Sequence, residues 1–134
     1  QDNFALDAYP VDAVEWLDAR GLLGTEVRLV SRDYVGTYLE ALEGEDVRVF
    51  MDDRYDMFPA DVADDYIDLV KGLDPEVVLE RYDAQVVLWN HETPLASWLE
   101  QSDDWGIVYD DEEWVVACPR PAAGEPGRCP TSRP

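Results

Sequence analysis

The sequence V-F-M-D-D-R-Y-D-M-F, residues 49–58, carries the strongest fold signal in this chain. Apolar and β-prone residues from Val49 to Met51 lead directly into a dense group of charges, and Pro59 then opens a new periodic segment. A buried strand that ends in charged residues places ionisable groups at the carboxyl edge of a sheet, where open α/β folds bind their ligands. The segment therefore predicts one strand of an α/β domain with a site beside it.

Helical and strand signals alternate on both sides of this segment. Helices are predicted at residues 11–17, 34–42, from Pro59 to Gly72, at 75–82 and from Pro94 onward, and strands at 27–30, 47–51 and 84–89. Asp74 and Thr93 are the expected capping residues of the last two helices. Apolar runs at 107–109 and 114–117 flank four acids and predict a terminal hairpin. Strands separated by helices imply parallel crossovers. We therefore predict the α/β class: a three-layer Rossmann-like domain at residues 9–118, with a mainly parallel sheet and a C-terminal antiparallel hairpin, followed by a Pro/Gly-rich tail at 119–134.

The composition is acidic and still rich in core-forming residues. The 134 residues include 31 acids, 10 basic residues and 46% apolar residues, which gives a net charge of −21. This charge repels phosphate backbones and anionic lipid headgroups, so no nucleic acid partner is expected. It indicates a well-solvated surface, an adaptation to high salt, or a surface that gathers cations. No window of the sequence approaches the ~20 apolar residues of a membrane-spanning helix.

The two cysteines, Cys118 and Cys129, both lie close to the end of the sequence. A disulfide between them is expected if the domain is exported. The alternative is a pair of free thiols in a flexible tail. The spacing is not of the CxxC kind, so no metal–thiolate site is predicted.

Polar side chains gather in the loops that follow the three predicted strands. Because the carboxyl ends of parallel strands meet at one edge of a sheet, we expect these loops to converge. The candidate ligand- or partner-binding residues are Arg32, Asp33, Tyr34, Asp52, Asp53, Arg54, Asp56 and His91. In the alternative interpretation, Arg32 and Arg54 pair with neighbouring aspartates and only tie the loops together.

No specific chemistry is predicted for these loops. The acids after the second strand, with Glu92, offer oxygen ligands, but their spacing matches no calcium-binding loop. His91 has no Ser or Cys partner in a recognisable motif, and no Gly-rich nucleotide loop is present. We therefore predict no catalytic residue, no metal and no cofactor. The tryptophans are expected in the core, with Trp89 or Trp105 as an alternative platform for stacking a sugar.

Residues 9–17 (YPVDAVEWL), 33–39 (DYVGTYL) and 49–58, in this order, carry a family resemblance. The chain resembles the C-terminal soluble domain of bacterial polytopic membrane proteins related to the dolichyl-phosphate-mannose-type glycosyltransferases. Residues 79–88 and 105–117 also fit, so the resemblance covers about residues 9–118. The chain departs from the family pattern where Asp52-Asp53-Arg54 replaces Asp-Gly-Arg. It also departs where the shorter Val35-Gly36-Thr37-Tyr38 replaces Trp-Gly-Gly-Tyr.

The resemblance implies an extracytoplasmic domain in a protein that moves a sugar from a polyprenyl-phosphate carrier. Residues 1–8 would then be a linker from a preceding membrane segment, which fits a start without Met or a basic leader. The single Lys also fits an outward-facing domain. The catalytic acid is expected elsewhere in the parent protein.

The resemblance thus implies a non-catalytic accessory domain that orients an acceptor or partner. Its expected partners are the membrane-embedded part of its own chain and a glycan or lipid-linked sugar. The alternatives are a protein–protein interaction module of an envelope membrane protein and, from a different class, a free-standing metal-dependent hydrolase.

Overall fold

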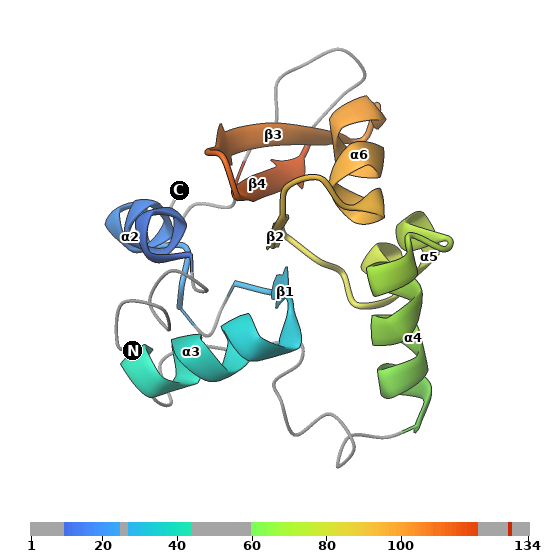
Figure 1. Ribbon diagram of the computed structural model, residues 1–134, viewed down its shortest axis with the longest axis horizontal. Coiled ribbons are helices and arrows are strands. Elements are labelled where there is room, and N and C mark those ends of the chain that lie inside the picture. Colours follow the sequence, from blue (N-terminus) through green and yellow to red (C-terminus); the bar gives the residue numbers. More distant parts are fainter. Residues whose placement is uncertain (1–9, 25–26, 44–59, 121–128, 130–134) are drawn as a thin grey trace.

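The computed structural model describes residues 10–24, 27–43, 60–120 and 129 (Figure 1). The described elements, in chain order, are α2 (Val11–Ala19), β1 (Leu29–Ser31), α3 (Asp33–Glu43), α4 (Ala60–Lys71), α5 (Pro75–Arg81), β2 (Val86–Asn90), α6 (Pro94–Gln101), β3 (Trp105–Asp110) and β4 (Trp114–Pro119). Each helix and strand predicted within these ranges is present. The strand predicted at residues 47–51 lies outside the described residues. No helix in the described part is long and apolar enough to cross a membrane.

The sheet is mixed, which corrects the predicted fold class. Its four described strands lie in the order β1-β2-β4-β3. Only β1 and β2 are parallel, whereas β4 runs antiparallel to both β2 and β3. The prediction of a three-layer Rossmann-like domain with a mainly parallel sheet is therefore wrong, and the domain is a small α+β arrangement. The cause is the chain after α6: it returns as the predicted hairpin, and the second strand of that hairpin docks directly beside β2.

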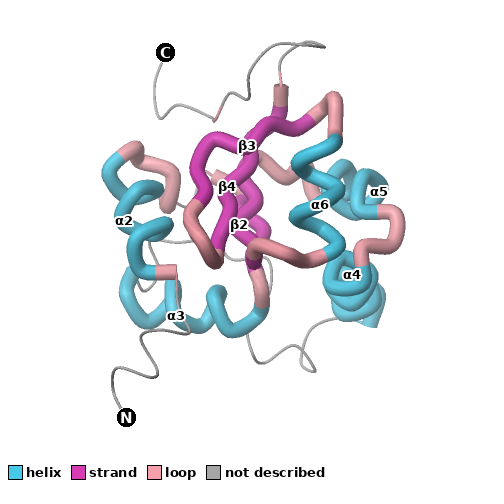
Figure 2. Tube along the Cα trace, turned by 45° about the horizontal axis from the view of Figure 1, so that its top comes forward, coloured by secondary structure: helices cyan, strands magenta, loops and turns pink. Residues whose placement is uncertain are grey.

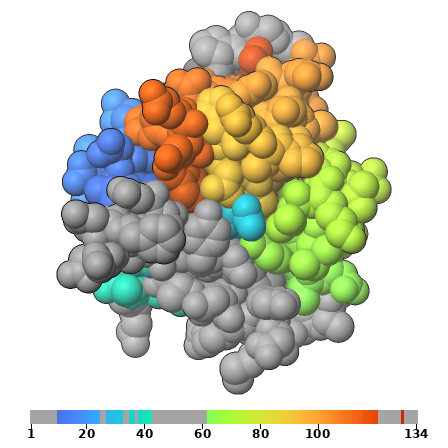
Figure 3. Space-filling view, in the orientation of Figure 1, coloured from blue at the N-terminus to red at the C-terminus, as the bar shows by residue number. Residues whose placement is uncertain are grey.

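Both faces of the sheet are covered by helices, with α2 and α3 on one side and α4, α5 and α6 on the other (Figures 1 and 2). Successive side chains of a strand point to opposite faces. In β2, Val86 and Leu88 join the core cluster on the α2–α3 side, while Val87 and Trp89 join the cluster on the α4–α6 side. The space-filling view shows α2 bordering the β3–β4 hairpin at the surface (Figure 3). The continuous apolar run of β2 is explained by this two-sided burial.

The helices bury the apolar stripes that their sequences carry. In α2, the buried residues are Ala13, Val14 and Leu17, at helical spacing, and its acids face water. In α6, Leu95 and Leu99 are buried in the same way. An amphipathic stripe of this kind is stable only when it packs against another element, which here is the sheet.

Residues in the left-handed conformation end three of the helices. Gly21 after α2, Gly72 after α4 and Asp83 after α5 have φ values of 71°, 73° and 52°. After α4, the Gly72 amide donates to the Leu69 carbonyl and the Leu73 amide to the Asp68 carbonyl, at 3.1 and 2.8 Å. This is the Schellman arrangement, which satisfies the last carbonyls of a helix.

Two helix starts were predicted from capping residues. At α6 the prediction is confirmed, because the Thr93 side chain accepts a hydrogen bond from the Ala96 amide at 3.3 Å. At α5, Asp74 occupies the capping position but makes no side-chain cap bond and has left-handed backbone angles. Pro75 follows it at the first helical position, as predicted.

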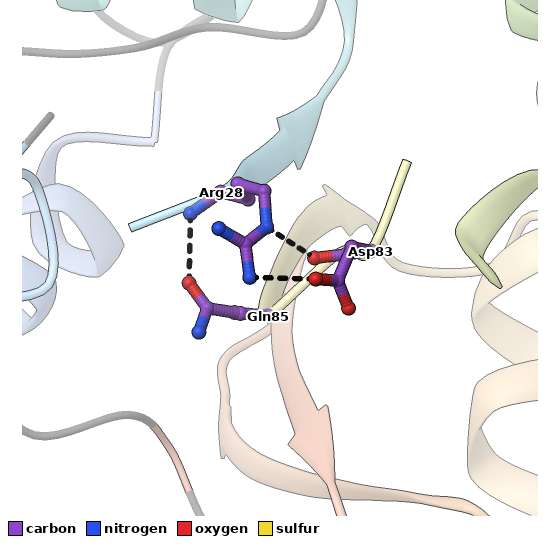
Figure 4. A network of polar contacts seen from close by, with 3 residues as sticks. All are labelled: Arg28, Asp83 and Gln85. Carbon is purple, nitrogen blue, oxygen red and sulfur yellow. Dashed lines mark hydrogen bonds and ion pairs between the residues drawn. The ribbon is translucent and has the colours of Figure 1, made fainter. Parts of the chain in front are cut away.

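A polar network joins the amino-terminal ends of β1 and β2 (Figure 4). The Arg28 guanidinium donates to the Asp83 carbonyl at 2.7 Å and to the Asp83 carboxylate at 2.8 Å. The Arg28 amide donates to the Gln85 side-chain oxygen at 3.1 Å. These contacts hold the register of the parallel pair at the edge opposite the predicted site. Because the ion pair is exposed, its contribution to the free energy of unfolding is small.

Cys118 and Cys129 form a disulfide. Cys118 is fully buried in β4, within the core cluster on the α2–α3 side, and Cys129 packs against the same cluster. The alternative of two free thiols is therefore wrong. The predicted tail is joined covalently to the sheet at residue 129, and residues 121–128 and 130–134 lie outside the described residues.

Candidate functional site

The carboxyl ends of β1 and β2 lie at the same edge of the sheet because these two strands are parallel. Arg32 follows β1 and His91 follows β2. Since β4 is antiparallel to β2, its first residue Trp114 pairs with Asn90. The turn between β3 and β4 therefore reaches this edge as well. We call the group formed by Arg32, residues 90–92 and residues 110–113 the carboxyl edge.

The structure describes part of the predicted site. The side chains of Arg32 and His91 lie at the carboxyl edge, as predicted. Asp33 and Tyr34 open α3, where only their backbone is described. The candidates after the predicted second strand, Asp52, Asp53, Arg54 and Asp56, lie outside the described residues. Sequence reasoning missed the acids of the hairpin turn, because their place at this edge depends on where the hairpin docks.

Arg32 braces three elements at this edge. Its Nη1 donates to the Asn90 side-chain oxygen at 2.6 Å, and its Nε donates to the Tyr66 hydroxyl on α4 at 3.3 Å. Its guanidinium carbon lies 5.6 Å from the ring centroid of Trp89, within the range of a cation–π contact. These contacts link β1, β2 and α4, so Arg32 joins separate elements at this edge through an amide and a phenol. Its pairing with neighbouring aspartates stays a prediction.

His91 ties the loop after β2 to the hairpin turn. Its backbone amide donates to the Glu113 carbonyl at 2.7 Å. Its Nε2 lies 4.0 Å from a carboxylate oxygen of Asp110. The side chain is partly buried, with 25% of its surface exposed, so the imidazole contacts both water and the acids of the turn.

The turn itself is held by Asp111. One carboxylate oxygen accepts hydrogen bonds from the Glu113 and Trp114 amides, and the other accepts from the Tyr109 hydroxyl, all at 2.8 Å. Burial acts to raise the pKa of Asp111, but these hydrogen bonds and the nearby His91 outweigh it and lower the pKa. Burial, the bond to Asp111 and neighbouring negative charges raise the pKa of Tyr109 to about 12.

The alternative of a sugar-stacking platform at Trp89 or Trp105 is wrong, and the expectation that these tryptophans lie in the core is confirmed. Trp89 is fully buried between β2 and α4, and Trp105 is 7% exposed. Among the other tryptophans, Trp16 and Trp98 are partly exposed. The sequence did not separate these cases, because the exposed fraction of a tryptophan depends on residues far away in the chain that pack against it.

The carboxyl edge presents carboxylates around a histidine, while its arginine is engaged by side chains of the chain itself. Within the described ranges, no group of three or more His, Cys, Asp or Glu side chains is arranged to hold a metal ion. The arrangement is suited to binding or presenting charge. No protein-family model matches the chain, and searches of curated proteins and of solved structures gave no match.

Proposed function

We propose that this chain is a non-catalytic accessory domain of a membrane-embedded glycosyltransferase-like protein that uses polyprenyl-phosphate sugars. In this proposal the domain lies on the extracytoplasmic face of the membrane, and its carboxyl edge orients the acceptor, a glycan or lipid-linked sugar. The observation that carries the binding role is the carboxyl edge itself, where Arg32 is fixed by Asn90 and Tyr66 while the acids of the hairpin turn remain at the surface. The segments that carry the family resemblance follow one another in the family's order across residues 9–118, and this order supports a parent protein of that kind.

The disulfide supports the extracytoplasmic placement. Disulfides persist in oxidising compartments outside the cytoplasm and are rare within it. Cys118 and Cys129 are paired, and both pack against the core on the α2–α3 side. A chain that was alkylated rapidly by a thiol reagent on intact cells would contradict the placement, because the proposal requires these cysteines to be oxidised there.

Photo-cross-linking in the intact membrane tests the role of the carboxyl edge. A photoreactive amino acid replaces Glu112, which is exposed in the hairpin turn, and the matched control replaces Glu76, which is exposed on α5. We expect adducts with a lipid-linked sugar or a glycan from position 112 and none from position 76. Equal adducts from both positions, or no adduct from position 112, would contradict the proposal.

A protein–protein interaction module without sugar binding is the second candidate function. It is favoured by the four consecutive acids at residues 110–113, because a concentration of one charge steers association with an oppositely charged partner. The same experiment separates the two functions. A protein adduct at position 112 without any carbohydrate supports the interaction module.

A further inference from the structure

Two aromatic rings form a small shelf where α2 meets the β3–β4 hairpin, the border seen in the space-filling view (Figure 3). The ring centroids of Trp16 on α2 and Tyr109 on β3 lie 5.5 Å apart, with the ring planes tilted by 46°. Both side chains pack against the core on the α2–α3 side and are still partly exposed. We call Trp16 and Tyr109 the aromatic shelf. Its position is distinct from Trp89, which contacts Arg32 in the interior.

A positive group already lies on this shelf. The guanidinium carbon of Arg20 is 4.1 Å from the ring centroid of Trp16, and its Nη1 donates to the Trp16 carbonyl at 3.3 Å. Arg20 makes no ion pair with any residue in the described part of the chain, although its own helix carries three acids. Arg20 follows Trp16 by four residues, so its guanidinium covers the face of the ring one helical turn before it.

A carboxylate is hydrogen-bonded to the shelf, and further negative charges lie near it, so the shelf attracts cations. Asp111 accepts the hydrogen bond of the Tyr109 hydroxyl at 2.8 Å. The charges of Asp12, from α2, and Asp110, from the hairpin, both act on that hydroxyl. An aromatic face within reach of carboxylates is the arrangement that proteins use to bind ammonium and guanidinium groups. An anionic lipid or nucleic acid would be repelled by the same carboxylates.

We propose that the aromatic shelf binds an arginine or lysine side chain from a basic segment of a partner protein, and that Arg20 occupies the shelf in the free chain. Charge complementarity with a chain of net charge −21 supports a basic partner. The inference requires a protein partner but no sugar-transferring parent, so it stands or fails independently of the proposed membrane context. The arriving side chain displaces Arg20 from the ring of Trp16.

Titration with the tripeptide acetyl-Gly-Arg-Gly-amide tests this binding, followed by the NMR signal of the Trp16 indole N–H. We expect saturable shifts of Trp16 and Tyr109 at physiological ionic strength, about 0.15 M. The shift of Tyr109 should be lost in Trp16→Leu, and the shifts of both residues should be kept in Trp98→Leu, which removes the other partly exposed tryptophan. Shifts spread evenly over the acidic surface, without saturation at Trp16, would overturn the proposal.

Arg20→Ala gives the sharper test, because it removes the internal occupant and leaves the shelf intact. Release of an exposed cation–π contact should tighten binding of the tripeptide by about 2- to 5-fold. Lys71→Ala on α4 is the matched control, since it removes the same charge from an exposed helix position away from the shelf. Equal affinities of the two variants would show only general charge attraction and would refute the role of Arg20. The comparison of Arg20→Ala with Lys71→Ala remains a valid test even if the Trp16→Leu variant does not fold.

Discussion

Removal of the Cys118–Cys129 disulfide should cost a large fraction of the free energy of unfolding. The two cysteines are 11 positions apart, so the bond closes a loop of 12 residues counting both. In the chain-entropy model, a loop of this length restricts the unfolded chain by about 3 kcal/mol. The total free energy of unfolding of a domain of this size is about 5–15 kcal/mol. Cys129→Ala is the preferred variant, because it leaves the fully buried Cys118 in its core position.

Urea unfolding followed by tryptophan fluorescence measures the effect. With an m-value of about 1–3 kcal/mol/M, the midpoint of Cys129→Ala should fall by about 1–3 M relative to the oxidised wild-type chain. The m-value itself should rise, because the unfolded chain without the bond is more expanded. Reduced wild-type protein should match the variant, and a reductant should not affect the variant. A loss below about 0.5 kcal/mol would refute the calculation, since it would mean that the bond restricts the unfolded chain far less than its loop length requires.

Two further outcomes follow from the backbone and from a tyrosine. Gly72→Ala should lower the free energy of unfolding by at least about 1–2 kcal/mol, because φ is +73° and the added Cβ would lie 2.5 Å from the Pro94 Cβ. Gly24→Ala is the control: its added Cβ would have nothing within 4 Å, so thermal or urea unfolding should show little change in that free energy. The raised pKa of Tyr109 means that this hydroxyl contributes stability that is fully present below pH 10.0 and is lost as the pH rises to about 12. Absorbance titration should show a late phenolate for Tyr109 that titrates earlier in Asp111→Asn; an unchanged titration would contradict the hydrogen bond and the charge of Asp111 as causes.

Much of the local structure followed from the sequence, because its signals lie within a few residues. The apolar run of β2 and the stripe of α2 identified buried elements of the right kind. Thr93 before Pro94 marked the start of α6, and Gly72 marked the end of α4, because a hydroxyl at a cap and a residue that tolerates positive φ are local requirements. The terminal hairpin was recognised from two short apolar runs around acids.

Only part of the candidate site could be predicted from the sequence. Placing Arg32 and His91 at one edge needed only that β1 and β2 be parallel, which the helical crossover between them made a safe prediction. The acids of the hairpin turn were missed, because the side of β2 on which the hairpin docks is decided by contacts between residues far apart in the chain. The partners of Arg32, which are Asn90 and Tyr66, come from such distant positions and leave no local pattern.

By itself, the sequence determined which of the described segments become helices and strands, where several of them end, and that the chain is strongly acidic. Only the tertiary structure decided the strand order, the antiparallel placement of β4 beside β2, the pairing of Cys118 with Cys129 and the choice of Trp16 over Trp89 as an accessible ring. The physical reason is that periodicity and capping act over one or two turns of chain. Strand order is different, because several arrangements bury similar apolar area and the packing of the whole core selects one of them.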